Sequence, residues 1–311
     1  MADHDLQAIR QFLVSVAFEA GKLIMDAKVT SEAVAIKKNS QLSSLSPLWH
    51  VITDGATATD IVTEVDQVVE SLILTRLTKE YPGFSFIGEE SFKAGEECLS
   101  DEPTFIVDPI DGTSNLVHGF PAVCVSIGLA IDQIPVVGVV YNPHLDEIWT
   151  AAQGHGANMQ SRGATVQKLP LRQMPLEGLQ SACVGIEFGS DRQGDNFDST
   201  MRLITRLLKT KATGGSFVNS LRATGSAAIT ICRVASGQQD AFWECGAWAW
   251  DVAAAWCILV EAGGLMVDVH PGNWKPRLDG RRYLAIRPAS QGQKEFVEEL
   301  WSQVGNDRWT V

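Results

Sequence analysis

The chain is organised around the stretch Phe105-Ile106-Val107-Asp108-Pro109-Ile110-Asp111-Gly112-Thr113-Ser114-Asn115. Its first three residues are apolar and predict the end of a buried strand. Pro109 has no N–H to donate to a central ladder, so the strand is expected to stop at Val107. Asp111-Gly112 is typical of a turn, and the short polar side chains from Thr113 to Asn115 are able to cap a following helix.

Two carboxylates, Asp108 and Asp111, therefore leave a rigid strand on a tight bend, beside a hydroxyl and free backbone groups. Mg²⁺ and similar hard cations prefer such an all-oxygen environment. The alternative is an Asx-turn followed by a helix cap, which needs one acid and accounts for neither the second carboxylate nor the proline. The spacing alone leaves both interpretations open.

The composition is that of a folded acidic protein. The 311 residues are 45% apolar and 20% charged, which is enough for a sizeable core and argues against wholesale disorder. The net charge is −12 and the sequence pI is about 4.9. That balance argues against a nucleic-acid binder, which concentrates Lys and Arg against phosphates. An acidic protein binds an anionic substrate when metal ions supply positive charge locally.

The cysteines and the N-terminus indicate a reducing compartment. Six cysteines are scattered without any CxxC pair, at Cys98, Cys124, Cys183, Cys232, Cys245 and Cys257. Buried reduced thiols are expected, and a disulfide framework is the remoter alternative. The N-terminus lacks the features of a signal peptide, and no apolar run reaches the roughly 20 residues that span a bilayer. We expect a cytoplasmic protein with no membrane or nucleic-acid partner.

The first half of the chain has helices at its start and then strands. Apolar spacing predicts helices over residues 6–28 and from Asp60 to about residue 80, with a Ser-, Thr- and Gly-rich surface loop over 40–59 between them. A short strand over 84–87 ends at Gly88-Glu89-Glu90-Ser91. Further strands are predicted over 123–131, 136–141 and 148–152, which favours an antiparallel meander. Gly154-His155-Gly156 is interpreted as a hairpin loop rather than a dinucleotide motif.

The second half alternates between strands and helices. A strand over 183–186 and helices over 198–209, 225–236 and 248–262 favour a partly parallel sheet. Asp251 lies near the start of the last of these helices, where its negative charge complements the helix dipole, so capping and metal binding are both open for it. We expect one catalytic domain over 1–311, with an α+β half over 1–180 and an α/β half over 181–311.

Taken together, these segments resemble the inositol monophosphatase family, a group of Li⁺-sensitive, Mg²⁺-dependent phosphatases. The resemblance follows family order from residue 6 to residue 288 and rests on four motifs: Gly88-Glu89-Glu90-Ser91, Asp108-Pro109-Ile110-Asp111-Gly112-Thr113, Trp250-Asp251-Val252-Ala253-Ala254 with Glu261-Ala262-Gly263-Gly264, and Asp60-Ile61-Val62-Thr63 with Asp66-Gln67. It implies an α/β (α+β) fold, the layered αβαβα sandwich, and a homodimer.

The resemblance also implies a metal centre of two to three Mg²⁺ ions. Glu89 and Asp108, with the backbone carbonyl of Ile110, resemble the ligands of the first ion. Asp108, Asp111 and Asp251 resemble those of the second, and Glu89 also faces a third, weaker ion. Asp and Glu supply the hard oxygen that Mg²⁺ selects, and no His is needed.

Catalytic roles follow from the same resemblance. Thr113 and Glu89 resemble the pair that orients the attacking water, and Asp66 resembles the carboxylate that orients Thr113. Water then attacks phosphorus directly, without a phosphoenzyme, while the metal ions activate it and stabilise the departing alkoxide.

Substrate-binding roles are implied for a further set of residues. The backbone amides of Gly112 and Thr113 would hold the phosphate. The alcohol half would be lined by Ser190, Ala227 and Glu244, and Asp111 would also meet a substrate hydroxyl. A carboxylate at position 244 favours a polyol, because it accepts hydrogen bonds from hydroxyls and repels a second phosphate.

The expected reaction is Mg²⁺-dependent hydrolysis of small phosphate monoesters, with inositol monophosphate as the leading substrate. The alternatives are a phosphatase for histidinol phosphate, a sugar phosphate or adenosine bisphosphate, a catalytically idle regulator that binds inositol phosphate, and a structural metal-binding module. Retention of every expected metal ligand argues against the idle regulator.

Two features depart from the family pattern. The segment between Lys37-Lys38 and Asp60 is longer than in relatives, and we expect it to modulate entry of the third ion. Trp243, Trp248 and Trp250 are expected to pack in the core, with a role in the substrate pocket as the alternative. His118, His144 and Cys245 are expected to be structural.

Overall fold

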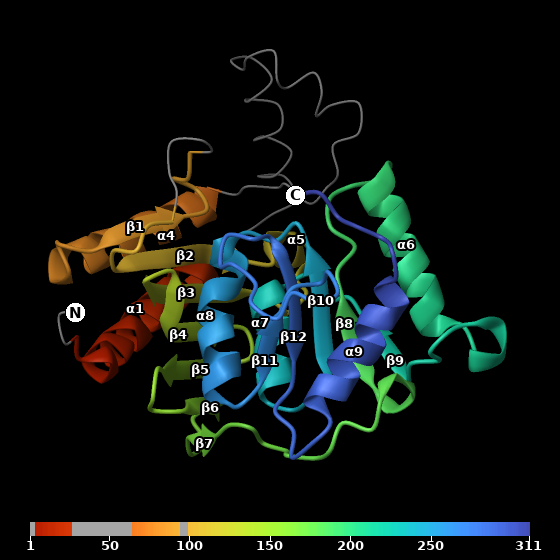
Figure 1. Ribbon diagram of the computed structural model, residues 1–311. Helices are drawn as coiled ribbons and strands as arrows, with labels where there is room; N and C mark the ends of the chain where they lie inside the picture. Colours follow the sequence, from red (N-terminus) through yellow and green to blue (C-terminus); the bar gives the residue numbers. More distant parts are fainter. Residues whose placement is uncertain (1–3, 27–63, 94–98) are drawn as a thin grey trace, which may run out of the picture.

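The computed structural model describes residues 4–26, 64–93 and 99–311 (Figure 1). Several predictions concern residues outside these ranges. The residues concerned are Lys37, Lys38, the loop over 40–59, the segment Asp60–Thr63, and Cys98. The other five cysteines are free, as expected. No helix in the described ranges is both long and apolar enough to cross a bilayer.

The first sheet has seven strands whose spatial order follows the chain. Strands β1 and β2 are parallel, and every later neighbour is antiparallel, which confirms the predicted meander. Gly154-His155-Gly156 links β5 to β6 as a hairpin loop, also as predicted. The strands are β1 (Ser85–Gly88), β2 (Thr104–Asp111), β3 (Cys124–Ile131), β4 (Ile134–Asn142), β5 (Glu147–Ala152), β6 (Ala157–Ser161) and β7 (Gln167–Lys168).

Strand β2 is buried along its whole length and does not stop at Val107. The prediction of an early stop was wrong, because the ladder to β3 resumes beyond the proline. Asp108 pairs with Ser126 and Asp111 with Cys124, so β2 carries one extra residue between these pairs. Pro109 lies in this bulge, where the ladder requires no N–H from it. The bulge separates Asp108 from Asp111 on a strand that remains fixed in the sheet.

Gly112 ends the strand and begins α5 (Thr113–His118). Its φ is +94°, and a Cβ here would lie 2.5 Å from the carbonyl oxygen of Ala122, so glycine is required. The predicted cap by the residues from Thr113 to Asn115 was wrong, because these residues lie inside the helix and Gly112 is its N-cap. Asn115 instead donates from Nδ2 to the carbonyls of Ala122 and Thr224, each at 2.8 Å, which joins α5 to the second half of the chain.

The second sheet has five strands and is mixed, which confirms the partly parallel arrangement expected from the alternating pattern. Strand β8 is parallel to both β9 and β10, while β12 is antiparallel to β10 and β11. In spatial order the strands are β11 (Leu265–Val267), β12 (Arg282–Ile286), β10 (Ala241–Cys245), β8 (Cys183–Ile186) and β9 (Ser220–Arg222).

The helices and sheets stack as helix, sheet, helix, sheet, helix (Figure 1), the predicted αβαβα sandwich. Helices α1 (Leu6–Asp26) and α4 (Glu64–Glu80) cover the outer face of the first sheet. The two sheets enclose α7 (Ala227–Ala235) and α8 (Ala249–Glu261). The far face of the second sheet packs against α6 (Asp195–Leu208) and α9 (Gln293–Val304).

Helix α8 lies unusually close to the first sheet. A Cβ on Gly138 of β4 would lie 2.1 Å from the carbonyl oxygen of Ala254, and one on Gly128 of β3 would lie 3.0 Å from the Ala254 nitrogen. Alanines at 253, 254 and 255 and glycines on the strands are what permit this approach. Because the packing leaves little free space, the start of α8 is held in a fixed position relative to β2 and β3.

Candidate active site

Four carboxylates from three separated segments meet where β1 and β2 end. Gly88 pairs with Val107 in the parallel β1–β2 ladder, so Glu89, just after β1, lies beside Asp108. Asp251 is the third residue of α8. The Ser126 hydroxyl donates to the Trp250 carbonyl at 3.3 Å, which ties the start of α8 to the strand opposite Asp108.

Asp108 lies at the centre of this carboxylate cluster, which consists of Glu89, Asp108, Asp111 and Asp251. Its side chain is 1% exposed and is in hydrogen-bond contact with the carboxyl groups of Glu89 and Asp251. Carboxyl groups share a hydrogen bond only when one of them carries a proton. Burial first, and then the charges of Glu89 and Asp111, raises the pKa of Asp108 well above its usual value. The Ile110 N–H also donates to Asp108 Oδ1 at 2.9 Å and orients the side chain.

Asp111 is tied to the start of α7. Its Oδ2 accepts hydrogen bonds from the Ser226 hydroxyl at 2.6 Å and from the Ala228 N–H at 2.8 Å. Burial raises the pKa of Asp111 to about 6, although these hydrogen bonds and a contact from the Cys124 thiol lower it. Ser226 is also the side-chain cap of α7, through the Ile229 N–H.

Asp251 has the helix-capping role that the sequence left open. Its Oδ2 accepts the Trp248 N–H at 2.6 Å, and its position in the first turn suits a negative charge. Burial and the charge of Asp111 raise the pKa of Asp251 to about 7, against the lowering effect of the Trp248 hydrogen bond and of Arg281. This capping bond uses one of the two carboxylate oxygens, so capping and metal binding are compatible at Asp251.

Glu89 lies at the mouth of the cluster, and its side chain is open to solvent. Protein around its carboxyl and the nearby charge of Asp251 nevertheless raise the pKa of Glu89 to about 8. The turn that carries it is anchored by Glu70 of α4, whose Oε2 accepts the Glu90 N–H at 2.8 Å. Glu70 is 4% exposed and lies where a Cβ on Gly88 would clash, so this turn packs tightly on α4.

The donor set fits a hard divalent cation. All four side chains offer carboxylate oxygen. The neighbouring charges that raise their pKa values are negative, and Arg281 is a positive charge that lowers the pKa of Asp251. In the described ranges, no three His, Cys, Asp or Glu side chains are arranged to hold an ion as they stand. The carboxyls instead lie against one another, and their burial and mutual repulsion raise their pKa values in the absence of a compensating cation. Mg²⁺ would supply the positive charge that the cluster lacks.

Thr113 and Asp66 border the cluster. The Thr113 hydroxyl donates to the Ile110 carbonyl at 3.0 Å, and that oxygen keeps a second lone pair for another partner. Asp66, 2% exposed in the first turn of α4, adds to the raised pKa of Glu89 through its charge. The predicted orientation of Thr113 by Asp66 requires the hydroxyl to turn away from Ile110.

The residues expected to bind substrate come from the second half of the chain, and two of them, Ala227 and Glu244, lie near the cluster. Ala227 opens α7 beside Asp111. Ser190 is exposed in the loop after β8, and Glu244 is in β10. The Glu244 Oε2 atom is buried and has no hydrogen-bond partner in the described part of the chain. Burial, followed by the charges of Asp251, Glu187 and Asp111, raises its pKa well above the usual value.

Glu187 and Ser226 contact the site but were not predicted as site residues from the sequence. Glu187 Oε1 accepts the N–H groups of Thr224 at 2.7 Å and Gly225 at 2.9 Å, so it holds the loop before α7 against the end of β8. Ser226 precedes an apolar helical run, and that pattern predicts an N-cap. No local pattern marks Glu187, because its partners are far along the chain.

His118, Cys245 and Trp243 make contacts that fit the structural roles expected of them, whereas Trp248, expected in the core, is 36% exposed. His118 Nδ1 contacts the Ser114 carbonyl one turn earlier at 2.7 Å. Burial and the charge of Glu244 raise the pKa of the Cys245 thiol, which disfavours the nucleophilic thiolate. Trp243 is 1% exposed and packs edge-to-face on Trp309, which confirms the core role for this tryptophan.

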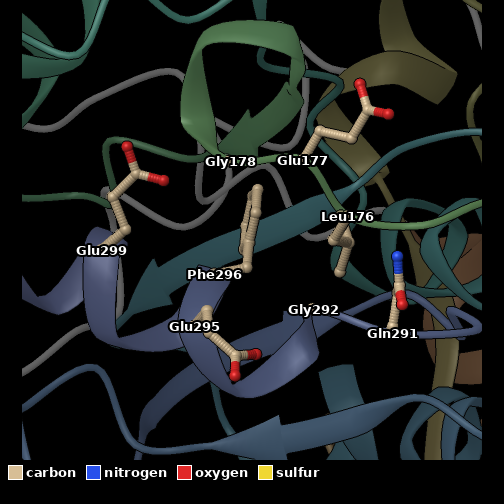
Figure 2. A pocket seen from close by; sticks show the side chains of 8 residues that line it. All are labelled: Leu176, Glu177, Gly178, Gln291, Gly292, Glu295, Phe296 and Glu299. Carbon is tan, nitrogen blue, oxygen red and sulfur yellow. The ribbon is translucent and has the colours of Figure 1, made fainter.

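A cavity of about 430 Å³ lies elsewhere, between the start of α9 and the segment before β8 (Figure 2). Its glutamates, Glu177, Glu295 and Glu299, point in different directions rather than toward one centre. Glu299 is already engaged, because its Oε2 accepts the Leu179 N–H at 2.9 Å. None of the lining residues belongs to the carboxylate cluster, so this cavity is not a second view of the same site.

Sequence comparisons identify close relatives of the chain. A family model described as the inositol monophosphatase family matches residues 5–305. Inositol monophosphatase 2 of Saccharomyces cerevisiae is 48% identical over 260 residues, covering 82% of this chain and 86% of the relative. Inositol monophosphatase 1 of the same yeast is 38% identical over 305 residues, covering 96% and 97%.

Solved structures match over nearly the whole chain. An inositol monophosphatase from Anabaena (Nostoc) superposes with a TM-score of 0.71 at 26% identity, covering 98% of each chain. Mycobacterium tuberculosis SuhB superposes with a TM-score of 0.70 at 25% identity, covering 98% of this chain and 100% of that one. The layered architecture is therefore shared with known phosphatase structures.

Proposed function

The chain belongs to the inositol monophosphatase family, and from this premise we propose that it is a Mg²⁺-dependent phosphatase of small phosphate monoesters, with inositol monophosphate as its leading substrate. The observation that carries the proposal is the meeting of Glu89, Asp108, Asp111 and Asp251 in one cluster whose pKa values are all raised. Such a cluster is costly without a cation, and hydrolysis of a phosphate ester needs concentrated positive charge.

Two to three Mg²⁺ ions would be held by this cluster together with the Ile110 carbonyl. When bound, they supply a lowered pKa for a coordinated water and neutralise the charge of the phosphate and leaving group. The Ile110 carbonyl suits this role because its residue lies buried close to Asp108 and its oxygen already faces the Thr113 hydroxyl at 3.0 Å.

The protein's own groups would orient the attacking water. Glu89, which is open to solvent and would be ionised once the cations are bound, is placed to accept a hydrogen bond from that water. The Thr113 hydroxyl would turn from Ile110 to hold the same water, with Asp66 as its acceptor. Both residues lie on rigid supports, since Glu89 follows β1 and Thr113 begins α5.

Substrate recognition would use both halves of the chain. The backbone amides of Gly112 and Thr113 would bind the phosphate, where the glycine φ of +94° turns the chain. Ser190, Ala227 and Glu244 would line the alcohol side, with Asp111 near one hydroxyl. The buried, unpartnered Oε2 of Glu244 is the best support, because a polyol hydroxyl would donate the hydrogen bond that this atom lacks in the described chain.

The test is phosphate release from inositol monophosphate, histidinol phosphate, a sugar phosphate and adenosine bisphosphate, with Mg²⁺ and then with added Li⁺ or Ca²⁺. We expect the fastest release from the inositol ester, only with Mg²⁺, and inhibition by both added ions. Asp108→Asn should abolish it, whereas Asp279→Asn, which alters an exposed ion pair, should not. Absence of phosphate release from every ester refutes the proposal, and a phosphorylated side chain refutes direct attack by water.

We also propose that the chain forms a homodimer, as the family resemblance implies. Light scattering during size-exclusion chromatography should give twice the chain mass of 33.8 kDa. A single-chain mass over the working concentration range contradicts this part of the proposal alone.

A further inference from the structure

Phe92 connects the two segments that carry Glu89 and Asp251. Its backbone N–H donates to the Gly88 carbonyl at 2.9 Å, which closes the turn around Glu89. Its half-buried ring lies 5.5 Å from the Trp248 ring and 5.1 Å from the Trp250 ring, measured between centroids. These two tryptophans lie three residues before and one residue before Asp251, so one side chain reaches from the first carboxylate segment to the third.

The tryptophan side of this contact is itself held firmly. The rings of Trp248 and Trp250 stack 5.1 Å apart with an interplanar angle of 11°. The Trp248 N–H is the donor that orients Asp251, at 2.6 Å. Because this donor is the backbone N–H of Trp248, packing that holds the Trp248 residue in place also holds the Asp251 carboxylate.

Arg281 fixes the exposed part of the same stack. Its guanidinium carbon lies 3.8 Å from the centre of the Trp248 ring, a cation–π contact. Its Nη2 also donates to the Gly246 carbonyl at 2.6 Å, while the Gly246 N–H donates to the Arg281 carbonyl at 2.8 Å. Arg281 adopts a φ of +54°, and such a conformation persists only where surrounding contacts enforce it.

We propose that Phe92 is a positioning residue that holds the Glu89 turn at a fixed separation from Asp251 and so sets the affinity of the cluster for its divalent cation. The inference rests on the proposed function, because it assumes that the cluster holds Mg²⁺. Phe92 itself touches neither the cation nor the substrate in this scheme.

The test measures Mg²⁺ binding without substrate, by isothermal titration calorimetry and by the rise in melting temperature on adding Mg²⁺. We expect Phe92→Ala to weaken Mg²⁺ binding about 10-fold, the equivalent of about 1.4 kcal/mol. Phe92→Leu should weaken Mg²⁺ binding less than Phe92→Ala does. Phe92→Tyr should bind Mg²⁺ as the wild type does, because the aromatic ring remains. In turnover, the Mg²⁺ concentration for half activity should rise, while KM for substrate at saturating Mg²⁺ stays unchanged.

Phe12→Ala is the matched control. Phe12 is also half-buried, packs edge-to-face on Tyr81 at 5.6 Å and has Arg76 over its ring, but it lies on α1, far from the cluster in the fold. This variant should melt at a lower temperature and bind Mg²⁺ as the wild type does.

The outcomes separate the two proposals. A folded Phe92→Leu with wild-type Mg²⁺ affinity overturns the positioning role, as does an equal loss of affinity in Phe12→Ala. Phe92→Leu also decides the question if Phe92→Ala does not fold. If the wild type binds Mg²⁺ but hydrolyses no ester, the proposed function fails while the affinity series still decides the positioning role. If the wild type binds no Mg²⁺, both proposals fail.

Discussion

Binding of Mg²⁺ should displace protons from the carboxylate cluster, so its apparent affinity should rise steeply with pH. Three of the carboxyls have pKa values near or above neutrality, at about 8 for Glu89, about 7 for Asp251 and about 6 for Asp111. The perturbation is a titration of metal-free protein with Mg²⁺ at a series of pH values between about 6 and about 9.

The magnitude follows from these pKa values. At pH 7, groups with pKa values of about 8, 7 and 6 carry about 0.9, 0.5 and 0.1 proton, so an ion that requires all three ionised displaces at least about 1.5 protons, to which any proton on Asp108 adds. The apparent affinity should then rise at least about 30-fold per pH unit near pH 7.

Calorimetry in buffers of different ionisation enthalpy measures the displaced protons directly. The slope of binding enthalpy against buffer enthalpy should give at least about 1.5 protons at pH 7 and fewer at pH 9. An affinity that stays constant from pH 6.5 to pH 8.5, with no buffer dependence, would refute the reasoning, because the carboxyls would then be ionised before the metal arrives.

The same pKa values predict how the metal-free protein responds to pH. The unfolded chain ionises these carboxyls near pH 4, whereas the folded protein retains their protons up to about pH 6 to 8. The folded state therefore binds more protons across this window, and its free energy of unfolding falls as pH rises through it. The melting temperature in EDTA should be lower at pH 8 than at pH 6, and saturating Mg²⁺ should remove the difference.

Three substitutions test the supporting structure. Gly112→Ala should lower the free energy of unfolding by about 2 kcal/mol or more in urea titration, because φ is +94° and the new Cβ meets a carbonyl, whereas Gly83→Ala, with open space around it, should be nearly neutral. Ser226→Ala removes a helix cap and a donor to the cluster, and should cost about 1–3 kcal/mol while weakening Mg²⁺ binding at neutral pH. Arg287→Ala removes a buried guanidinium from the partly buried Asp240 carboxylate and from backbone carbonyls, and should cost about 1–3 kcal/mol, while the exposed Arg277→Ala should barely move the urea midpoint. A Gly83→Ala or Arg277→Ala loss as large as its counterpart would contradict these assignments.

Much of the architecture was predictable because it depends on local sequence patterns. The apolar run before Asp108, the alternation in the strands of the first sheet and the Pro-Gly stop after α4 each depend on residues close together in sequence. The early end predicted for β2 failed for a non-local reason, since the bulge that accommodates Pro109 exists only when β3 pairs alongside.

The candidate site was less accessible to prediction. The four clustered carboxylates were recognised because each belongs to a motif, and the structure brings them together as expected from their segments. Glu187, Phe92 and Arg281 carried no such signal. Their relevance depends on contacts with Thr224, Trp248 and the α8 start, which belong to other elements.

Local patterns specify where the helices and most strands run and which carboxylates are available, because backbone propensity, turn residues and short motifs act over a few neighbouring residues. How those carboxylates face one another, how far their pKa values are raised and which residues hold them there depend on the folded arrangement. Burial and Coulomb repulsion depend on distances across the fold, and close packing of α8 against Gly128 and Gly138 sets those distances.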